Sequence, residues 1–172
     1  MELTKAKKIA EEVVVLLEGA CEKIEIAGSI RRRKPEVGDI EILCVPKFEE
    51  GIDLLDAELG GLMIQQIFTH RRNRRGSIMY GRENKFLLHK PSGIGVDIFS
   101  TTMERWPVAM VVRTGGKETN IEISRRAQER GMRFHAYGQG FTQADGTELV
   151  CSSEQDVFKA VGLRYLEPWE RR

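Results

Sequence analysis

Three acidic residues are spaced so that neighbouring β-strands could bring them together. Asp39 and Glu41 are two apart in an alternating segment, residues 39–45, so both would point to one face of a strand. Asp97 stands in a second apolar segment, residues 96–99, where an unpaired carboxylate is costly to bury. If the two strands are neighbours, the carboxylates converge into the oxygen ligand set that Mg²⁺ prefers. The alternative is a polar sheet edge on which Asp97 is held by a salt bridge.

A glycine turn upstream could bind phosphate. Gly28 and Ser29 follow an alternating segment, residues 24–27, and a glycine lets the backbone approach a phosphate closely. Arg32 follows and offers a guanidinium fork for phosphate oxygens. Gly28 lies 39 − 28 = 11 residues before Asp39, enough for a loop to return to the sheet. A phosphate cradle, a cation and three carboxylates are the parts needed for metal-assisted phosphoryl or nucleotidyl transfer.

The elements around these residues are those of an α+β chain. Strands are predicted over residues 24–27, 39–45, 62–69, 86–88 and 95–99, with helices over residues 4–19 and 51–60. Further along, helices are predicted over residues 104–112 and 117–130 and after Ser153, with a small meander over residues 133–150. This order is not an alternating βαβ array and indicates a mixed sheet with helices. We place a domain boundary near residue 103.

The composition is that of a globular intracellular protein. The 172 residues are 41% hydrophobic and 31% charged, with a net charge of +1. No apolar run is long enough to span a membrane, and no export signal is predicted. The three cysteines, Cys21, Cys44 and Cys151, are far apart and odd in number. They have neither the spacing of a zinc site nor the even count of a disulfide framework, so we expect a reducing, cytoplasmic setting.

Two basic clusters are candidate nucleic-acid surfaces. The first comprises Arg31, Arg33 and Lys34 around Arg32, and the second comprises Arg71, Arg72, Arg74 and Arg75. Cations of this kind bind backbone phosphates without reading base sequence. The alternative is a pair of solvated basic turns.

Taken together, these motifs resemble the nucleotidyltransferase signature of family X DNA polymerases. The matching segments are residues 28–32 (Gly-Ser-Ile-Arg-Arg), 38–41 (Gly-Asp-Ile-Glu), 96–98 around Asp97, 113–116 (Arg-Thr-Gly-Gly) and the tail at 162–171. The resemblance covers roughly residues 5–172. Many nucleotidyltransferases share a Gly-Ser pair, whereas the second glycine turn, Asn120 and the tail are far more specific to the polymerase branch.

The resemblance implies a nucleotidyltransferase palm over residues 1–103 and a thumb-like, nucleotide-selecting subdomain over residues 104–172. It implies addition of a dNTP, or an rNTP, to the primer 3′-hydroxyl of primer–template or gapped DNA, with release of pyrophosphate, as in short-gap repair. Asp39, Glu41 and Asp97 would be the catalytic residues and would hold two Mg²⁺ ions, or Mn²⁺ in their place. We expect a monomer without membrane contact, similar in plan to the smallest virus- or phage-encoded members.

The resemblance also implies which residues bind the nucleotide. The triphosphate would be held by Gly28, Ser29, Arg32 and Gly38, and the sugar and base edge by Arg113, Gly115, Gly116 and Asn120. Arg125 would contact nucleic acid, next to Ser124 at the position of the family's minor-groove arginine. This chain departs from the usual pattern in four places: Glu41 replaces an Asp, Val112-Arg113 replaces an aromatic pair, Gly116 replaces a Ser, and Ser124 replaces the minor-groove Arg.

Two other functions stay open on the sequence alone. One is a nucleotidyltransferase that modifies a small molecule, tRNA or protein; it would share the carboxylates but has no reason to carry the turn at residues 114–120. The other is a non-catalytic nucleic-acid-binding protein with a polymerase fold. Three retained acids argue against it, because clustered carboxylates cost stability without a metal.

Overall fold

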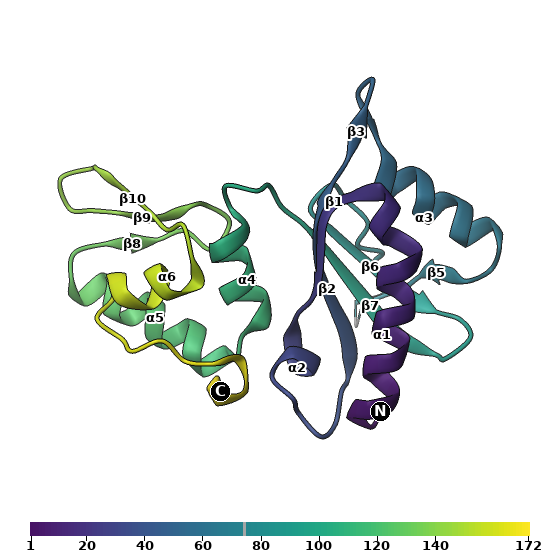
Figure 1. The fold of residues 1–172 in the computed structure, drawn as a ribbon, viewed down its shortest axis with the longest axis horizontal. Coiled ribbons are helices and arrows are strands. Elements are labelled where there is room, and N and C mark those ends of the chain that lie inside the picture. Colours follow the sequence, from purple (N-terminus) through teal and green to yellow (C-terminus); the bar gives the residue numbers. More distant parts are fainter. Residues whose placement is uncertain (74) are drawn as a thin grey trace. The chain divides into compact units, whose positions relative to one another are not determined.

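The computed structural model describes residues 1–73 and 75–172, so Arg74, one of the predicted nucleic-acid contacts, lies outside the described residues. The chain divides into two compact units, Met1–Thr101 and Thr102–Arg172 (Figure 1), which are described separately. Both combine helices with a sheet, and the α+β fold class is confirmed. Within the described ranges, no helix has the length and apolar character that a membrane span requires.

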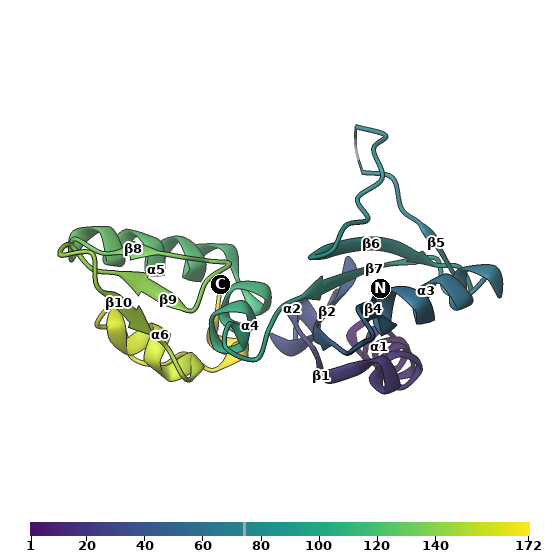
Figure 2. The ribbon, with the colours of Figure 1, turned by 90° about the horizontal axis from the view of Figure 1, so that it is seen from above.

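A five-stranded mixed sheet forms the centre of the first unit (Figure 2). In spatial order the strands are β1 (Cys21–Ile26), β2 (Asp39–Pro46), β7 (Ile94–Ser100), β6 (Asn84–His89) and β5 (Phe68–His70). β2 and β7 run parallel, and the other neighbours run antiparallel. A short hairpin, β3 (Phe48–Glu49) and β4 (Ile52–Asp53), follows β2. The strands that carry the three acidic residues are therefore neighbours at the centre of the sheet.

Helices α1 (Leu3–Leu17) and α3 (Leu54–Ile64) cover one face of this sheet (Figure 2). The 3₁₀ helix η1 (Glu18–Ala20) leads from α1 into β1. Buried α1 and α3 side chains pack with alternate strand residues, among them Ile40, Ile42, Val96 and Ile98. Because successive side chains in a strand point to opposite faces, Asp39, Glu41 and Asp97 lie on the face that these helices leave uncovered.

The predicted strand over residues 62–69 is wrong in its first half. Helix α3 continues to Ile64, and β5 begins only at Phe68. Leu55, Leu59 and Leu62 are all buried, and their spacing of four and three residues is that of a helix face. The apolar β-formers of this segment therefore complete α3 before the chain turns.

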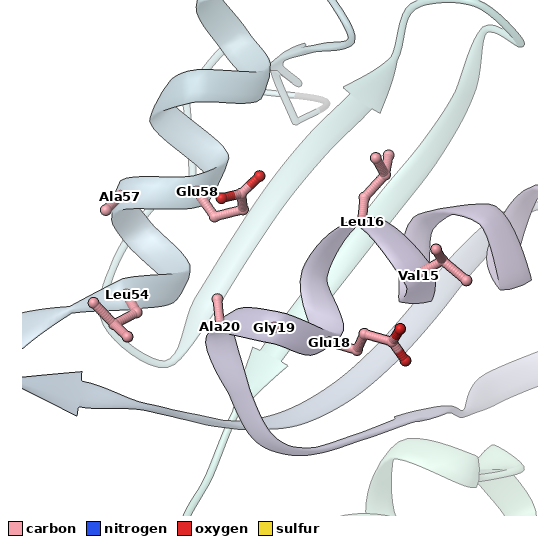
Figure 3. A pocket seen from close by; sticks show the side chains of 8 residues that line it. All are labelled: Val15, Leu16, Glu18, Gly19, Ala20, Leu54, Ala57 and Glu58. Atoms are coloured by element: carbon pink, nitrogen blue, oxygen red, sulfur yellow. The ribbon is translucent and has the colours of Figure 1, made fainter.

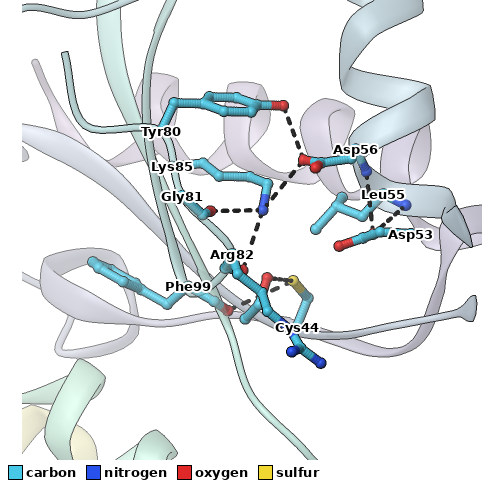
Figure 4. A network of polar contacts seen from close by, with 10 residues as sticks. Cys44, Asp53, Leu55, Asp56, Tyr80, Gly81, Arg82, Lys85 and Phe99 are labelled. Atoms are coloured by element: carbon cyan, nitrogen blue, oxygen red, sulfur yellow. Dashed lines mark hydrogen bonds and ion pairs between the residues drawn. The ribbon is translucent and has the colours of Figure 1, made fainter. Parts of the chain in front are cut away.

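A buried lysine joins β6 to α3 (Figure 4). Lys85 has no exposed side-chain surface; its Nζ donates to the carbonyls of Gly81 (3.0 Å) and Arg82 (3.2 Å) and lies 3.3 Å from an Asp56 carboxylate oxygen. The same Asp56 oxygen accepts from the Tyr80 hydroxyl at 3.1 Å. Burial and this carboxylate raise the pKa of Tyr80. These bonds satisfy the buried charge and fix the chain as it enters β6.

The second unit packs three helices and a small sheet around its own core. Its elements are α4 (Trp106–Thr114), α5 (Lys117–Glu129), β8 (Arg133–Phe134), β9 (Gly140–Thr142), β10 (Glu148–Val150), α6 (Glu154–Ala160) and the 3₁₀ helix η2 (Pro168–Glu170). The strands form an antiparallel sheet in the order β10-β9-β8. Helix α6 begins as predicted, because the Ser153 hydroxyl accepts from the Asp156 amide at 3.1 Å.

Arg171 ties the C-terminal tail into this second core. Its side chain is fully buried, and Nη1 lies 2.9 Å from a Glu154 carboxylate oxygen. Its other nitrogens donate to the Leu166 carbonyl (2.9 Å) and the Tyr165 hydroxyl (3.2 Å). The guanidinium carbon also lies 5.1 Å from the centre of the Phe158 ring. An arginine paired in this way is a structural member of the core.

Candidate active site

Strand register brings the three acidic residues to one place on the uncovered face. Glu41 of β2 is the register partner of Asp97 on β7, and Asp39 is the partner of Gly95. Asp97 is buried, at 7% exposure, whereas Asp39 and Glu41 are half-buried. The face is therefore acidic at the centre of the sheet.

A cation from a different segment lies against two of these carboxylates. Asp97 Oδ1 accepts a hydrogen bond from Arg71 Nη2, and Arg71 Nη1 lies 3.7 Å from Asp39 Oδ2. The guanidinium also stacks over the Phe86 ring, 5.6 Å from its centre. The salt-bridged Asp97 considered as an alternative above is thus present, and its partner is Arg71, for which the sequence suggested a nucleic-acid contact.

Glu41 packs against Gly28, in the turn that the sequence suggests as a phosphate-binding site. A methyl group at Gly28 would come within 1.7 Å of Glu41 Oε2, so this glycine is required for close packing. Its φ of +59° also favours glycine. The expected Gly-Ser turn is the start of one helical turn, α2 (Gly28–Arg31), and the Arg32 amide donates to the Gly28 carbonyl at 3.1 Å.

Ser29 supplies a buried hydroxyl next to this turn. Across residues 1–73 and 75–172, its Oγ has no hydrogen-bond partner. A buried hydroxyl in that state costs roughly 1–3 kcal/mol, a cost that a bound phosphate oxygen would remove. Arg31 and Arg32 are half-buried nearby, and Arg33, Lys34 and Gly38 are exposed.

The carboxylates have the right donor chemistry for a divalent metal but are arranged around a guanidinium. In the part of the chain that the structure describes, no three His, Cys, Asp or Glu side chains are grouped as metal ligands. Asp39 and Asp97 nevertheless share one cation, Arg71, so this pair can hold positive charge between them. Carboxylate oxygens of this kind suit Mg²⁺ and Mn²⁺. In the structure this positive charge is the guanidinium of Arg71.

In the second unit, the turn between α4 and α5 carries the predicted nucleotide contacts. Gly115 ends α4 with a φ of +72°, and its amide donates to the Val111 carbonyl at 3.0 Å. Asn120 Nδ2 donates to the Val112 carbonyl at 2.9 Å. Asn120 Oδ1 is buried and has no partner among the described residues. The Asn120 side chain is therefore held in place through Nδ2, and its Oδ1 can still accept a hydrogen bond.

Gly116 is explained by the residue that packs on it. A β-carbon at this position would lie 2.1 Å from the carbonyl carbon of Arg172. The Arg172 oxygen accepts from the Thr119 amide at 2.8 Å, and the Arg172 amide donates to the Thr119 hydroxyl at 3.1 Å. A serine here would collide with this backbone.

Arg113 and Arg125 have partners within the same unit. Arg113 Nη2 donates to the Tyr137 hydroxyl at 3.2 Å, a contact that no sequence signal suggested. Arg125 bonds Glu122 and Glu129 on the exposed side of α5. Hydrogen bonds from Arg125 and Arg126 lower the pKa of Glu122 to about 2.

One hollow of the first unit lies away from the acidic residues. It has a volume of about 560 Å³ and lies between α1, η1 and α3 (Figure 3). Its lining comprises Val15, Leu16, Glu18, Gly19, Ala20, Leu54, Ala57 and Glu58. Two carboxylates and apolar groups do not suit a phosphate, so the uncovered sheet face is the better candidate site.

Comparisons with known proteins point to one family. Residues 109–172 match the family model DNA polymerase beta thumb. DNA polymerase lambda of Rattus norvegicus is 28% identical over 165 residues, which cover 84% of this chain and 28% of that protein. DNA-directed DNA/RNA polymerase mu of Homo sapiens is 24% identical over 197 residues, covering 96% and 39%. DNA nucleotidylexotransferase of Xenopus laevis is 33% identical over 79 residues, covering 45% and 15%.

The fold agrees with these matches. Polymerase beta of Leishmania infantum, solved as a ternary P/T complex, superposes with a TM-score of 0.75 at 19% identity, covering 100% of this chain and 76% of that one. The chain spans only 15% to 39% of the length of the curated relatives named above. By these matches the chain is similar to the family X DNA polymerases, and its residues 109–172 match the DNA polymerase beta thumb.

Proposed function

We propose that this chain adds a nucleotide to the 3′-hydroxyl of a DNA primer and releases pyrophosphate, as in short-gap repair, acting as an intracellular monomer. The observation that carries the proposal is the register that sets Asp39, Glu41 and Asp97 on one open face of the central parallel strand pair. The printed names of the relatives, which include two DNA polymerases and a nucleotidylexotransferase, support DNA and nucleotides as substrates. A nucleotidyltransferase for a small molecule, tRNA or protein has no such support.

Asp39, Glu41 and Asp97 would hold two divalent ions, Mg²⁺ or Mn²⁺, which when bound neutralise phosphate charge and lower the pKa of the primer hydroxyl. The three carboxylates would fix the position of the metal ions' positive charge at the centre of the sheet. The Ser29 hydroxyl and the Arg32 guanidinium bind the β- and γ-phosphate oxygens, beside Gly28 and the exposed Gly38.

In the second unit, the α4–α5 turn would select the nucleotide. Gly115 and Gly116 present backbone without side chains to the sugar. Asn120 is held through Nδ2, so its Oδ1 accepts a hydrogen bond from the nucleotide. Arg113, which donates to the Tyr137 hydroxyl, lies beside this turn in sequence.

Primer extension by the purified chain tests the proposal. A labelled primer is offered in a one-nucleotide gap, on an open template and as a single strand, with Mg²⁺ or Mn²⁺ and with dNTPs or rNTPs separately. Extension of the gapped or templated primer is expected. A protein that extends none of the three substrates with either ion contradicts the proposal, and extension of the single strand alone indicates a template-independent transferase.

The exposed cations of the second basic cluster are expected to bind the DNA backbone. Arg72 and Arg75 are both exposed. Replacing both with Ala should weaken binding to all sequences equally and reduce the salt slope, −dlog K/dlog[salt], by about 0.9 per lost phosphate contact. Fluorescence anisotropy over a salt series measures this slope. Lys5→Ala/Lys8→Ala, which removes the same charge from the exposed side of α1, is the control; equal slopes for the two double variants would show a solvated surface.

Sugar discrimination is expected to be weak. Val112 and Arg113 stand where relatives place an aromatic pair, and the Arg113 side chain is engaged with Tyr137. Without deeply packed aromatic rings, the backbone at residues 112–113 should be held less firmly against the 2′-position of the nucleotide sugar. We expect kcat/KM on one gapped substrate to favour a dNTP over the matching rNTP by only about tenfold, or about 1.4 kcal/mol. A preference of about a thousandfold or more would show that this backbone is held rigidly.

A further inference from the structure

The Arg71 guanidinium fills the space between two of the candidate metal ligands. A methyl group built on Gly95 would lie 1.9 Å from Arg71 Nη1 and 2.8 Å from the guanidinium carbon. Gly95 is the register partner of Asp39 and stands two residues before Asp97, on the same face of the sheet. The charge of Arg71 is therefore centred where the two carboxylates meet.

Further contacts fix this side chain in place. The Arg71 amide donates to the Phe86 carbonyl at 3.0 Å, and the guanidinium lies over the Phe86 ring. Phe86 is in turn the partner of Asp97 across β6 and β7. The Arg71 side chain is 29% exposed, whereas Arg72 and Arg75 are exposed residues. Arg71 is thus built into the site.

Electrostatics opposes the binding of a metal ion beside Arg71 in this arrangement. The Asp97 side chain is 11% exposed, and a carboxylate at that depth requires a counter-charge. Arg71 supplies one positive charge, and a divalent ion would supply two at the same oxygens. Two cations in contact at one place repel strongly in a partly desolvated site.

We propose that Arg71 is an internal counter-cation that competes with the divalent metal for Asp39 and Asp97. Metal binding then releases the guanidinium, which becomes available to nucleic acid together with Arg72 and Arg75. The inference rests on the proposed function, since it takes the same carboxylates as the metal ligands.

Mn²⁺ binding to the full chain, without DNA or nucleotide, tests the competition. Free Mn²⁺ is measured by electron paramagnetic resonance. Arg71→Gln removes the charge, and Gly95→Ala keeps it but places a methyl group against the flexible end of Arg71. If the ion pair is formed in about nine molecules of ten, both variants should bind Mn²⁺ about tenfold more tightly than the parent. Arg71→Lys, which keeps a cation, should fall between.

Matched controls separate competition from a structural role. Arg72→Gln removes a neighbouring charge, and Gly81→Ala adds a methyl group in the same inter-strand segment; both should bind Mn²⁺ like the parent.

If Arg71 only organised the carboxylates, Arg71→Gln and Gly95→Ala would bind Mn²⁺ equally or more weakly, which would overturn the inference. If both variants bind Mn²⁺ as tightly as the parent does, and the parent extends primers, the inference about Arg71 is overturned while the proposed function stands. Absence of Mn²⁺ binding in parent and variants overturns both proposals. If Arg71→Gln fails to fold, Gly95→Ala carries the test.

Discussion

Replacing Asp97 with Ala is expected to lower kcat/KM for primer extension by about a thousandfold or more, equivalent to about 4 kcal/mol of transition-state stabilisation. Asp97 is the acidic residue that lies deepest in the sheet and the one that Arg71 bonds directly. In the proposed function this carboxylate would stabilise charge that develops during the reaction, so its loss should act on catalysis more than on substrate binding.

The protein is expected to remain folded in this variant. Removing Asp97 leaves Arg71 without one partner, but that side chain is partly exposed and can turn to water. Asp97→Asn keeps the shape and a hydrogen-bond acceptor while removing the charge, and it should be nearly as inactive. Glu25→Gln, on the exposed part of β1, is the matched control and should extend primers like the parent. Extension by Asp97→Ala within tenfold of the parent would remove the metal-ligand assignment.

The largest effect on stability is expected from Arg171→Ala in the second unit. Breaking a buried ion pair by removing one partner costs about 3–5 kcal/mol, because the other charge stays buried. Here the remaining groups are the Glu154 carboxylate, the Tyr165 hydroxyl and the Leu166 carbonyl. Stacking on Phe158 is lost as well. The tail should separate from α6, and the second unit should unfold at markedly lower denaturant.

Arg164→Ala is the control for that experiment. Arg164 pairs with Glu170 at 2.9 Å, but its side chain is 70% exposed, and exposed pairs of this kind contribute little to stability because water screens them. Urea unfolding followed by hydrogen exchange of the amides in α6 reports on the second unit separately from the first. Similar α6 protection in Arg171→Ala and Arg164→Ala would show that the buried pair is not needed.

Much of the fold could be predicted because its local signals agree with its tertiary packing. The alternation over residues 39–45 predicts both β2 and which of its side chains face away from the helices, and Ser153 marks the start of α6. The segment at residues 62–69 failed because β-forming residue types and helical spacing compete there, and burial of Leu62 with Leu59 decides for the helix.

The candidate site was less predictable because its decisive contact is long-range. Nothing in the sequence near Arg71 distinguishes it from Arg72 or Arg75, and all three suit a solvated basic turn. The difference arises only when β5 and β6 bring residue 71 over the glycine at position 95. The sequence does require some partner for a carboxylate in an apolar strand, but which cation of the chain becomes that partner depends on the sheet.

Each unit has its own apolar core, and the proposed division of residues follows these cores. The carboxylates belong to Met1–Thr101, and the turn proposed to select the nucleotide belongs to Thr102–Arg172. If the proposed roles hold, turnover and substrate preference would depend on separate stretches of sequence, each with its own packing constraints. Exchanging residues 102–172 between relatives, by evolution or by design, would then alter substrate preference and leave the reaction chemistry unchanged.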